Sequence, residues 1–154
     1  MIIVDVETTG IEPKKHSIVS IGAVDFLKPK NKFYTECRVW DGAEIWQGYA
    51  DSGNSLEING FTEKQIRDVG KKSPGEAVKE FLEWTKKCSN KTMAGINPWF
   101  DRDFLIDSCE RGGINWPLGY RTIDLHTIVY FHHLKRGIKI PIRKGKTDID
   151  SEKS

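Results

Sequence analysis

Two carboxylates follow the first apolar run of the chain, in the stretch MIIVDVETTG at residues 1–10. In an extended strand, side chains two positions apart point to the same face, so Asp5 and Glu7 share a face. Neighbouring acids repel each other, and each is costly to remove from water. A bound cation offsets both costs, and carboxylate oxygens suit Mg²⁺ or Mn²⁺. The alternative is a solvated turn, in which Asp5 only satisfies nearby backbone amides.

The residues around the two acids favour the metal interpretation. The run MIIV before them and the Ile- and Val-rich stretch 16–27 after them place the pair where a buried strand ends. Thr8, Thr9 and Gly10 then add free amides and two hydroxyls beside the acids. Gly10 permits either a positive φ or the close approach of another backbone.

A third acid is expected from the segment AGINPWFDRDFL. Its apolar residues Phe100, Phe104 and Leu105 recur at helical spacing and predict the core face of a helix. Asp101 lies near the amino end of that helix, close to the carboxyl end of a strand, where ligand sites in such sheets gather. Asp103 competes for the role, but its position predicts a side chain that faces solvent. A structural alternative for Asp101 is an acid favoured by the helix dipole.

The first strands and the segment after them follow from hydrophobic periodicity. Strands are predicted at 1–6, 16–27 and 32–40, as an antiparallel meander with a polar KPKN turn before the third. The segment 41–70 is rich in glycine and irregular, apart from one short helix at FTEKQIRDV that Thr62 can cap.

The second half of the chain alternates helices and short strands. The helix in SPGEAVKEFLEWTKKC begins with an S-x-x-E capping box at Ser73 and Glu76, and its predicted core positions are Ala77, Val78, Phe81, Leu82, Thr85 and Cys88. A short strand at 92–96, a helix stopped by Gly112 and Gly113, and a brief strand leading into a helix that ends near Gly137 follow. The order βββαβαβα predicts an α/β fold, a mixed sheet with helices packed on it.

Length and composition limit the class of protein. The 154 residues suit one domain, predicted at 1–140, followed by a polar tail at 141–154. A net charge of +2 excludes an overtly basic nucleic-acid-binding polypeptide, although a basic cluster near the end could contact phosphates or simply keep the tail soluble: Lys135, Arg136, Lys139, Arg143, Lys144 and Lys146. No secretory signal or membrane-length apolar run is found, so a cytoplasmic protein without membrane contact is expected. Buried free thiols are expected for Cys37, Cys88 and Cys109.

The motifs DVETTG, SIVSIGAV, SLEINGFTEKQI and NPWFDRDFL occur in that order over roughly residues 1–130, and together they resemble the DEDD superfamily of 3′→5′ exonucleases. This superfamily includes the proofreading epsilon subunit of replicative DNA polymerase, ribonuclease T and oligoribonuclease. The resemblance implies an RNase H-like fold, a single-stranded DNA or RNA 3′ end as substrate, and a polymerase or a second copy as possible partner.

The resemblance also implies roles for the acids. Asp5 would bridge two Mg²⁺ ions, Glu7 would hold the ion that activates the attacking water, and Asp101 would hold the second ion through its waters. Attack on a phosphodiester builds charge on both the entering and the leaving oxygen, which two metals ~3.5–4 Å apart can stabilise.

Further residues would contact the substrate by the same resemblance: Thr8, Thr9 and Gly10 around the terminal nucleotide, and Asn97, Trp99 and Phe100 along the strand. Trp99 could stack on a base, which is worth ~1–3 kcal/mol in single-strand binders. Its structural alternative is an aromatic residue packed on the core at the start of the helix.

The third motif of the superfamily, H-x4-D or Y-x3-D, is missing from the sequence. His126, His132 and His133 are not followed by Asp at the required spacing, nor is Tyr130, and Asp124 matches a position that is not a ligand. General-base help is worth ~10²–10⁴-fold, so residual or no hydrolysis is expected. Either the final helix, which carries this motif, is absent from this chain, or the chain descends from an exonuclease and no longer cuts. A missing helix would leave apolar sheet surface open, so self-association or low stability is expected.

Two other functions compete with an exonuclease. The first is a non-catalytic nucleic-acid-binding or subunit-interaction module on the same fold. The second is a different metal-dependent phosphohydrolase, which would differ in the position of the bond that it cuts.

Overall fold

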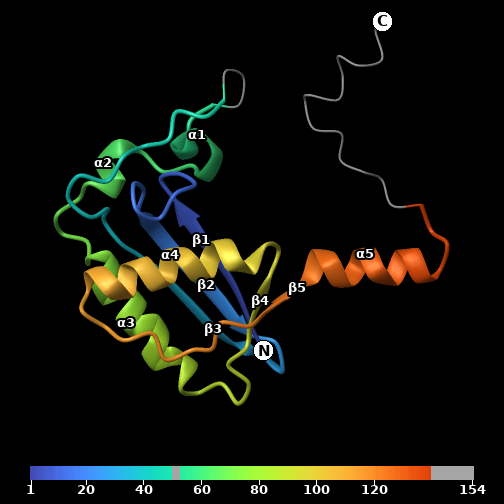
Figure 1. Cartoon of the computed structure of the whole chain (residues 1–154). Helices are drawn as coiled ribbons and strands as arrows, with labels where there is room; N and C mark the ends of the chain where they lie inside the picture. Colours follow the sequence, from blue (N-terminus) through green and yellow to red (C-terminus); the bar gives the residue numbers. More distant parts are fainter. Residues whose placement is uncertain (50–52, 140–154) are drawn as a thin grey trace, which may run out of the picture.

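A five-stranded mixed sheet forms the centre of the protein, in a computed structural model that describes residues 1–49 and 53–139 (Figure 1). Its strands are β1 (Ile2–Thr8), β2 (Ile18–Asp25), β3 (Lys28–Glu36), β4 (Met93–Gly95) and β5 (Thr122–Asp124). Their order in the sheet is β3-β2-β1-β4-β5. The first three strands are antiparallel, and β4 runs parallel to both β1 and β5. The predicted meander and mixed sheet are thereby confirmed.

In the described ranges, five helices accompany the sheet: α1 (Ser55–Asn59), α2 (Glu63–Ile66), α3 (Pro74–Thr85), α4 (Pro98–Arg111) and α5 (Leu125–Lys135). The two longest, α3 and α4, lie over one face of the sheet, whereas α1 and α2 lie beyond the end of β1 (Figure 1). Helix α5 leaves the sheet directly after β5 and extends away from the rest of the domain (Figure 1).

The capping box and apolar stripe predicted for α3 are confirmed. The Glu76 N–H donates to the Ser73 hydroxyl (3.3 Å), and the Ser73 N–H donates to the Glu76 carboxylate (2.7 Å). All six predicted core positions from Ala77 to Cys88 are buried. Phe81 packs edge-on against Phe33 of β3, with ring centroids 5.9 Å apart. The three cysteines are buried and free, as predicted.

The predicted position of the turn between β2 and β3 is wrong. The KPKN segment lies inside β3, and the turn is formed by Phe26 and Leu27. Asp25 sets this turn because its carboxylate accepts from the Leu27 N–H (3.1 Å). The stretch 37–40, predicted as strand, lies outside β3: the Cys37 N–H still donates to the Val19 carbonyl of β2 (2.9 Å), whereas the Val39 N–H donates to the Ile66 carbonyl at the end of α2 (2.8 Å).

The structure differs from the prediction in two further places, the end of β1 and the helix α1. Strand β1 continues to Thr8, so Asp5 and Glu7 lie within the strand and not after it. Helix α1 was missed inside the glycine-rich segment, although Asn54 and Glu57 form a capping box at its start. Thr62 caps α2 as predicted. The predicted tail at 141–154 lies outside the described residues. Within the part of the chain that the structure describes, no helix combines the length and apolar character needed to cross a membrane.

Candidate active site

Strand β1 presents two different faces to its surroundings. Ile2, Val4 and Val6 are buried under α3 and α4. Asp5 and Glu7 point to the opposite face, where they lie opposite Gly22 and Ser20 of β2. Partial burial raises the pKa of Glu7, and the negative charge of Asp5 raises it further.

Asp101 reaches this strand from the first turn of α4. Its side chain is 4% exposed, and its carboxylate accepts a hydrogen bond from the Val6 N–H (2.8 Å), between the two acids in sequence. Burial raises the pKa of Asp101 to about 7, and the charges of Asp5 and Glu7 act in the same direction, against the Val6 hydrogen bond. Asp103 instead pairs with Arg102 (2.7 Å), with its side chain 45% exposed.

The three carboxylates at this site are the kind of ligand that a hard divalent cation prefers. Asp5, Glu7 and Asp101 offer only carboxylate oxygens, and the charge of Asp5 raises the pKa of both Glu7 and Asp101. A cation would relieve this repulsion. The chemistry of these three side chains therefore fits Mg²⁺ or Mn²⁺. Within residues 1–49 and 53–139, however, no group of three or more His, Cys, Asp or Glu side chains lies close enough together to hold a metal ion.

A cavity of about 220 Å³ opens beside Glu7. Its walls are Val6, Glu7, Thr8, Gly10, Ile11, Trp46, Ser55, Ile58, Asn59 and Phe100. Four predicted site residues thus lie in one place, together with residues that sequence reasoning missed. The missed residues lie mainly in α1 and the segment before it. Those in α1 belong to the motif SLEINGFTEKQI, for which the sequence predicted no role in the site.

Thr9 does not line this cavity, but its hydrogen bonds hold the segment that does. It is fully buried; its hydroxyl donates to the Glu44 carbonyl (2.7 Å) and accepts from the Ser17 N–H (3.0 Å). Its carbonyl accepts from the Trp46 N–H and from the Ser55 hydroxyl, both at 2.7 Å. These bonds fix the segment that carries Trp46 and Ser55 against the end of β1.

Gly10 is needed for the contact with a neighbouring ring. A Cβ at this position would overlap the imidazole of His16, which is 3% exposed. The backbone φ of Gly10 is not among the positive values of the chain. Neither expectation for this glycine holds as stated, because its φ is not positive and its close neighbour is the His16 side chain and not a backbone.

The residues at the start of α4 are more exposed. Asn97 has a positive φ of 54°, and its N–H donates to the Asp124 carboxylate (3.4 Å). Trp99 is 55% exposed, and its ring contacts Phe100 edge-on, with centroids 6.4 Å apart. Phe100 lines the cavity and packs on Phe104, with ring centroids 4.9 Å apart.

Asp124 is the N-cap residue of α5. Its carboxylate accepts from the His126 N–H (3.1 Å) and from the Thr127 hydroxyl (2.6 Å), and so caps α5. These bonds lower the pKa of Asp124, the Thr127 hydroxyl most strongly.

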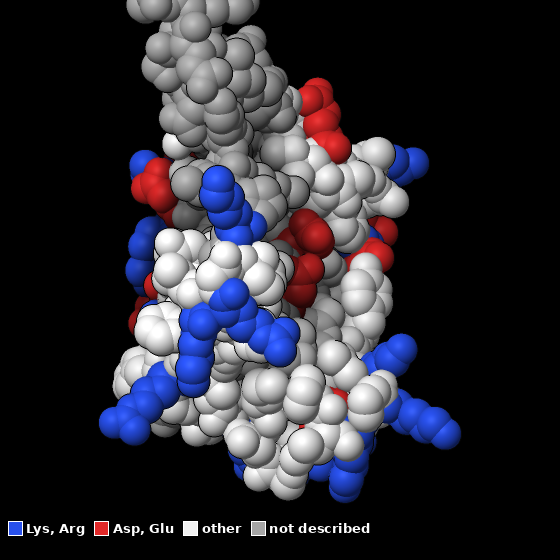
Figure 2. Space-filling view, turned by 90° about the vertical axis from the view of Figure 1, so that its right-hand side faces the viewer, with Lys and Arg blue, Asp and Glu red and all other residues white. Residues whose placement is uncertain are grey.

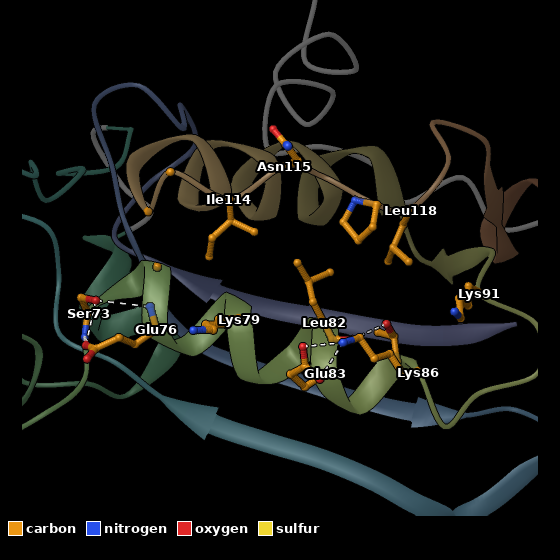
Figure 3. Close-up of a pocket in the computed structure, with 15 residues that line it drawn as sticks. Ser73, Glu76, Lys79, Leu82, Glu83, Lys86, Lys91, Ile114, Asn115 and Leu118 are labelled. Carbon is orange, nitrogen blue, oxygen red and sulfur yellow. Dashed lines mark hydrogen bonds and ion pairs between the residues drawn. The ribbon is translucent and has the colours of Figure 1, made fainter.

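A larger cavity, of about 660 Å³, lies between α3 and the segment 112–118 (Figure 3). Leu82 and Leu118 face each other across it, and Glu83 at its edge pairs with Lys86 (Figure 3). None of the predicted acids lines it. On the face in Figure 2, lysine and arginine side chains project from several separate places, and acidic side chains lie in a recess among them. The basic residues thus form no single stripe on this face.

Two ribonucleases T are similar to this chain in sequence. The ribonuclease T of Photobacterium profundum is 27% identical over 123 residues, which are 71% of this chain and 52% of the relative. The ribonuclease T of Haemophilus influenzae (strain 86-028NP) is 24% identical over 127 residues, 73% of this chain and 52% of the relative. The chain therefore spans about half the length of these relatives.

Solved structures of exonuclease I share the fold. A product-bound exonuclease I has a TM-score of 0.70 at 15% identity and covers 96% of this chain, which corresponds to 34% of that protein. The E. coli exonuclease I in complex with a dT13 oligonucleotide gives 0.70 at 16% identity, over 95% of this chain and 32% of that protein. The RNase H-like exonuclease fold is thereby confirmed.

A family model also covers most of the chain. The RNase T model, described as "Exonuclease", matches residues 2–136. These residues include the acids of β1, Asp101 and the walls of the cavity. The chain therefore belongs to the RNase T family of exonucleases.

Proposed function

We propose that this domain removes nucleotides from the 3′ end of single-stranded DNA or RNA. The observation that carries the proposal is the cavity beside Glu7, because it places apolar walls from Ile58 and Phe100 next to the uncovered acids of β1. A terminal base would lie against these walls, and its phosphodiester would face the acids. The exonuclease I bound to an oligonucleotide supports this class of substrate.

Asp5, Glu7 and Asp101 would hold two Mg²⁺ or Mn²⁺ ions. When bound, such ions lower the pKa of an attacking water and stabilise charge on the leaving oxygen. Asp101 is kept in place by the Val6 N–H, so its carboxylate is oriented before any ligand arrives. Thr8 lines the cavity while its hydroxyl donates to the Gly10 carbonyl (2.6 Å), which fixes the rim next to the acids.

A second candidate is a nucleic-acid-binding module that does not cut, because residues 1–154 contain no H-x4-D motif. Without the histidine base, hydrolysis is expected to be slower by ~10²–10⁴-fold than in an enzyme that has it. Trp99, exposed near the cavity residue Phe100, would serve either function by stacking on a base.

The decisive experiment uses a linear and a circular single strand of the same sequence, with Mn²⁺ or with EDTA. An exonuclease shortens a 5′-labelled linear strand stepwise and leaves the circle intact, whereas an endonuclease opens the circle. Asp5→Asn should abolish trace hydrolysis, and the control Asp103→Asn, which changes an exposed acid paired with Arg102, should retain it. Binding of the linear strand without any shortening would support the non-catalytic module.

A further inference from the structure

The cavity between α3 and the segment 112–118 takes no part in the proposed nuclease site, because none of Asp5, Glu7 and Asp101 lines it. At one end of it the two backbones touch: a Cβ added to Gly75 of α3 would lie 2.9 Å from the Cα of Gly112. From this contact the segment runs along α3 toward its carboxyl end (Figure 3). The space of about 660 Å³ between them is within the range of small-molecule sites, roughly 300–1,000 Å³.

The middle of this cavity is aliphatic. Leu82 and Leu118 face each other across it, and they are only 7% and 5% exposed (Figure 3). Ile114 points toward α3 (Figure 3), and Pro117 lines the cavity as well. Thr85 is a further lining residue, but its hydroxyl is occupied, because it donates to the Leu82 carbonyl (2.7 Å). The middle of the cavity therefore offers a ligand mainly apolar contacts.

Two cations lie where this cavity meets a neighbouring one. The neighbour, of about 490 Å³, shares Lys91, Pro117 and Leu118 with the first cavity. Its charged lining residues are Lys91 and Arg121. Both are exposed, and neither forms an ion pair within residues 1–49 and 53–139. An anionic group at this end therefore meets two unpaired positive charges.

The acids of the larger cavity are already engaged. Glu76 belongs to the capping box at the amino end of α3, where it accepts from the Ser73 N–H (2.7 Å). Glu83 pairs with Lys86 (2.7 Å) at the edge of the cavity (Figure 3). Lys79 is a further cation of the same lining. The walls of the two cavities together carry four cationic and two acidic side chains, which favours an anionic ligand.

We propose that the two joined cavities bind an acyl carboxylate, whose chain lies between Leu82 and Leu118 and whose carboxylate lies beside Lys91 and Arg121. An acyl chain has no hydrogen-bonding groups, so it loses none against aliphatic walls. A nucleobase would bring its N–H and C=O groups against the same walls without partners, which is unfavourable. A carboxylate forms strong, charge-assisted hydrogen bonds with lysine and arginine. The proposal stands apart from the nuclease function, because it needs neither a nucleic acid nor a metal ion.

Equilibrium dialysis of the full 154-residue chain against labelled decanoate, in the presence of EDTA, tests the proposal. The expected result is saturable binding of one decanoate per chain. Affinity should increase from octanoate to decanoate by up to about fourfold for each added methylene, the gain expected when a methylene leaves water. Decanol has a chain of the same length without the charge, so it should bind at least tenfold more weakly.

Two variants locate the carboxylate. Lys91→Gln and Arg121→Gln should each weaken decanoate binding at least threefold and leave decanol binding unchanged; both side chains are exposed, so the fold is kept. The matched control is Lys87→Gln, which changes an exposed lysine before β4 that lines neither cavity. Ile114→Ser should weaken the binding of both ligands, because it removes part of the aliphatic wall.

Four results would each overturn the proposal: no saturable binding of decanoate, equal affinity for decanoate and decanol, equal affinity of wild type and both Gln variants, or tighter binding of thymidine monophosphate than of decanoate. The last result would assign the cavities to a nucleotide. Asp5→Asn should leave decanoate binding unchanged, so a failure of this proposal and a failure of the nuclease proposal can be told apart.

Discussion

Replacing Asp101 by Asn should stabilise the metal-free protein above neutral pH. The pKa of this carboxyl is about 7 in the folded protein, compared with 3.8 for an ordinary aspartate. A raised pKa means that the folded state binds the proton more tightly than the unfolded chain. The contribution to stability is therefore fully present below pH 3.8 and is lost as the pH rises through about 7.

The size of the effect follows from the same difference. At about 1.4 kcal/mol per pH unit, the gap between 3.8 and about 7 corresponds to roughly 4 kcal/mol as an upper value. Asn carries no charge at any pH, and its carbonyl oxygen can still accept from the Val6 N–H. We expect Asp101→Asn to raise the free energy of unfolding at pH 8 by roughly 2–4 kcal/mol, which shifts Tm by about 5–10 °C.

Urea denaturation in EDTA at pH 5.5 and pH 8 measures this effect. Wild type should lose stability between the two values, and Asp101→Asn should lose much less. The matched control is Asp107→Asn, because Asp107 lies on the same helix and is also 4% exposed, but pairs with Lys14 (2.7 Å) and Arg111 (2.6 Å). The control should be destabilised at both pH values. A wild type with equal stability at pH 5.5 and 8, or an Asp101→Asn variant less stable at pH 8, would refute the reasoning.

Three further outcomes are expected. Mg²⁺ or Mn²⁺ at about 100 times its Kd should stabilise the protein at pH 8 by about 2.7 kcal/mol, and Glu7→Gln should remove most of this gain in a thermal melt. Gly10→Ala should cost about 1–3 kcal/mol in urea denaturation through overlap with the His16 ring, whereas Gly119→Ala, which meets open space, should be nearly neutral. Burial raises the pKa of the Cys37 thiol to about 12, so an alkylating reagent at pH 8 should label it only after unfolding, and rapid labelling of the native protein would contradict this.

The long helices could be predicted because their signals are local. The capping box at Ser73 and the apolar spacing through Phe81 need only neighbours within a few residues, and both features hold in the structure. The turn between β2 and β3 was predicted wrongly because its local signal is weak. Its turn at Phe26 and Leu27 carries no Gly, Pro or Asn, so the polar KPKN segment gave the stronger turn signal, while the Asp25 carboxylate set the real one.

The acids of the site were predictable, but the walls of the cavity were not. Alternation along a strand was enough to place Asp5 and Glu7 on one face. Trp46 and Ile58 reach the cavity because Thr9 binds the segment before α1 through its hydroxyl and carbonyl. These bonds join residues more than 30 positions apart, and no local pattern reveals such pairs.

The charges around the two acids of β1 bear on how a nucleic acid would approach. Several acids elsewhere in the described residues are paired, as Asp107 is with Lys14, Glu36 with Lys71 and Glu80 with Lys72. Asp5 and Glu7 form no ion pair there, although their mutual repulsion makes them costly. A phosphate would also be repelled by them, so a cation that screens the acids should favour the approach of a nucleic acid to this cavity. Binding at the cavity should therefore be tighter with the metal whether or not the chain cuts, and only the shortening of the strand separates the two proposed functions.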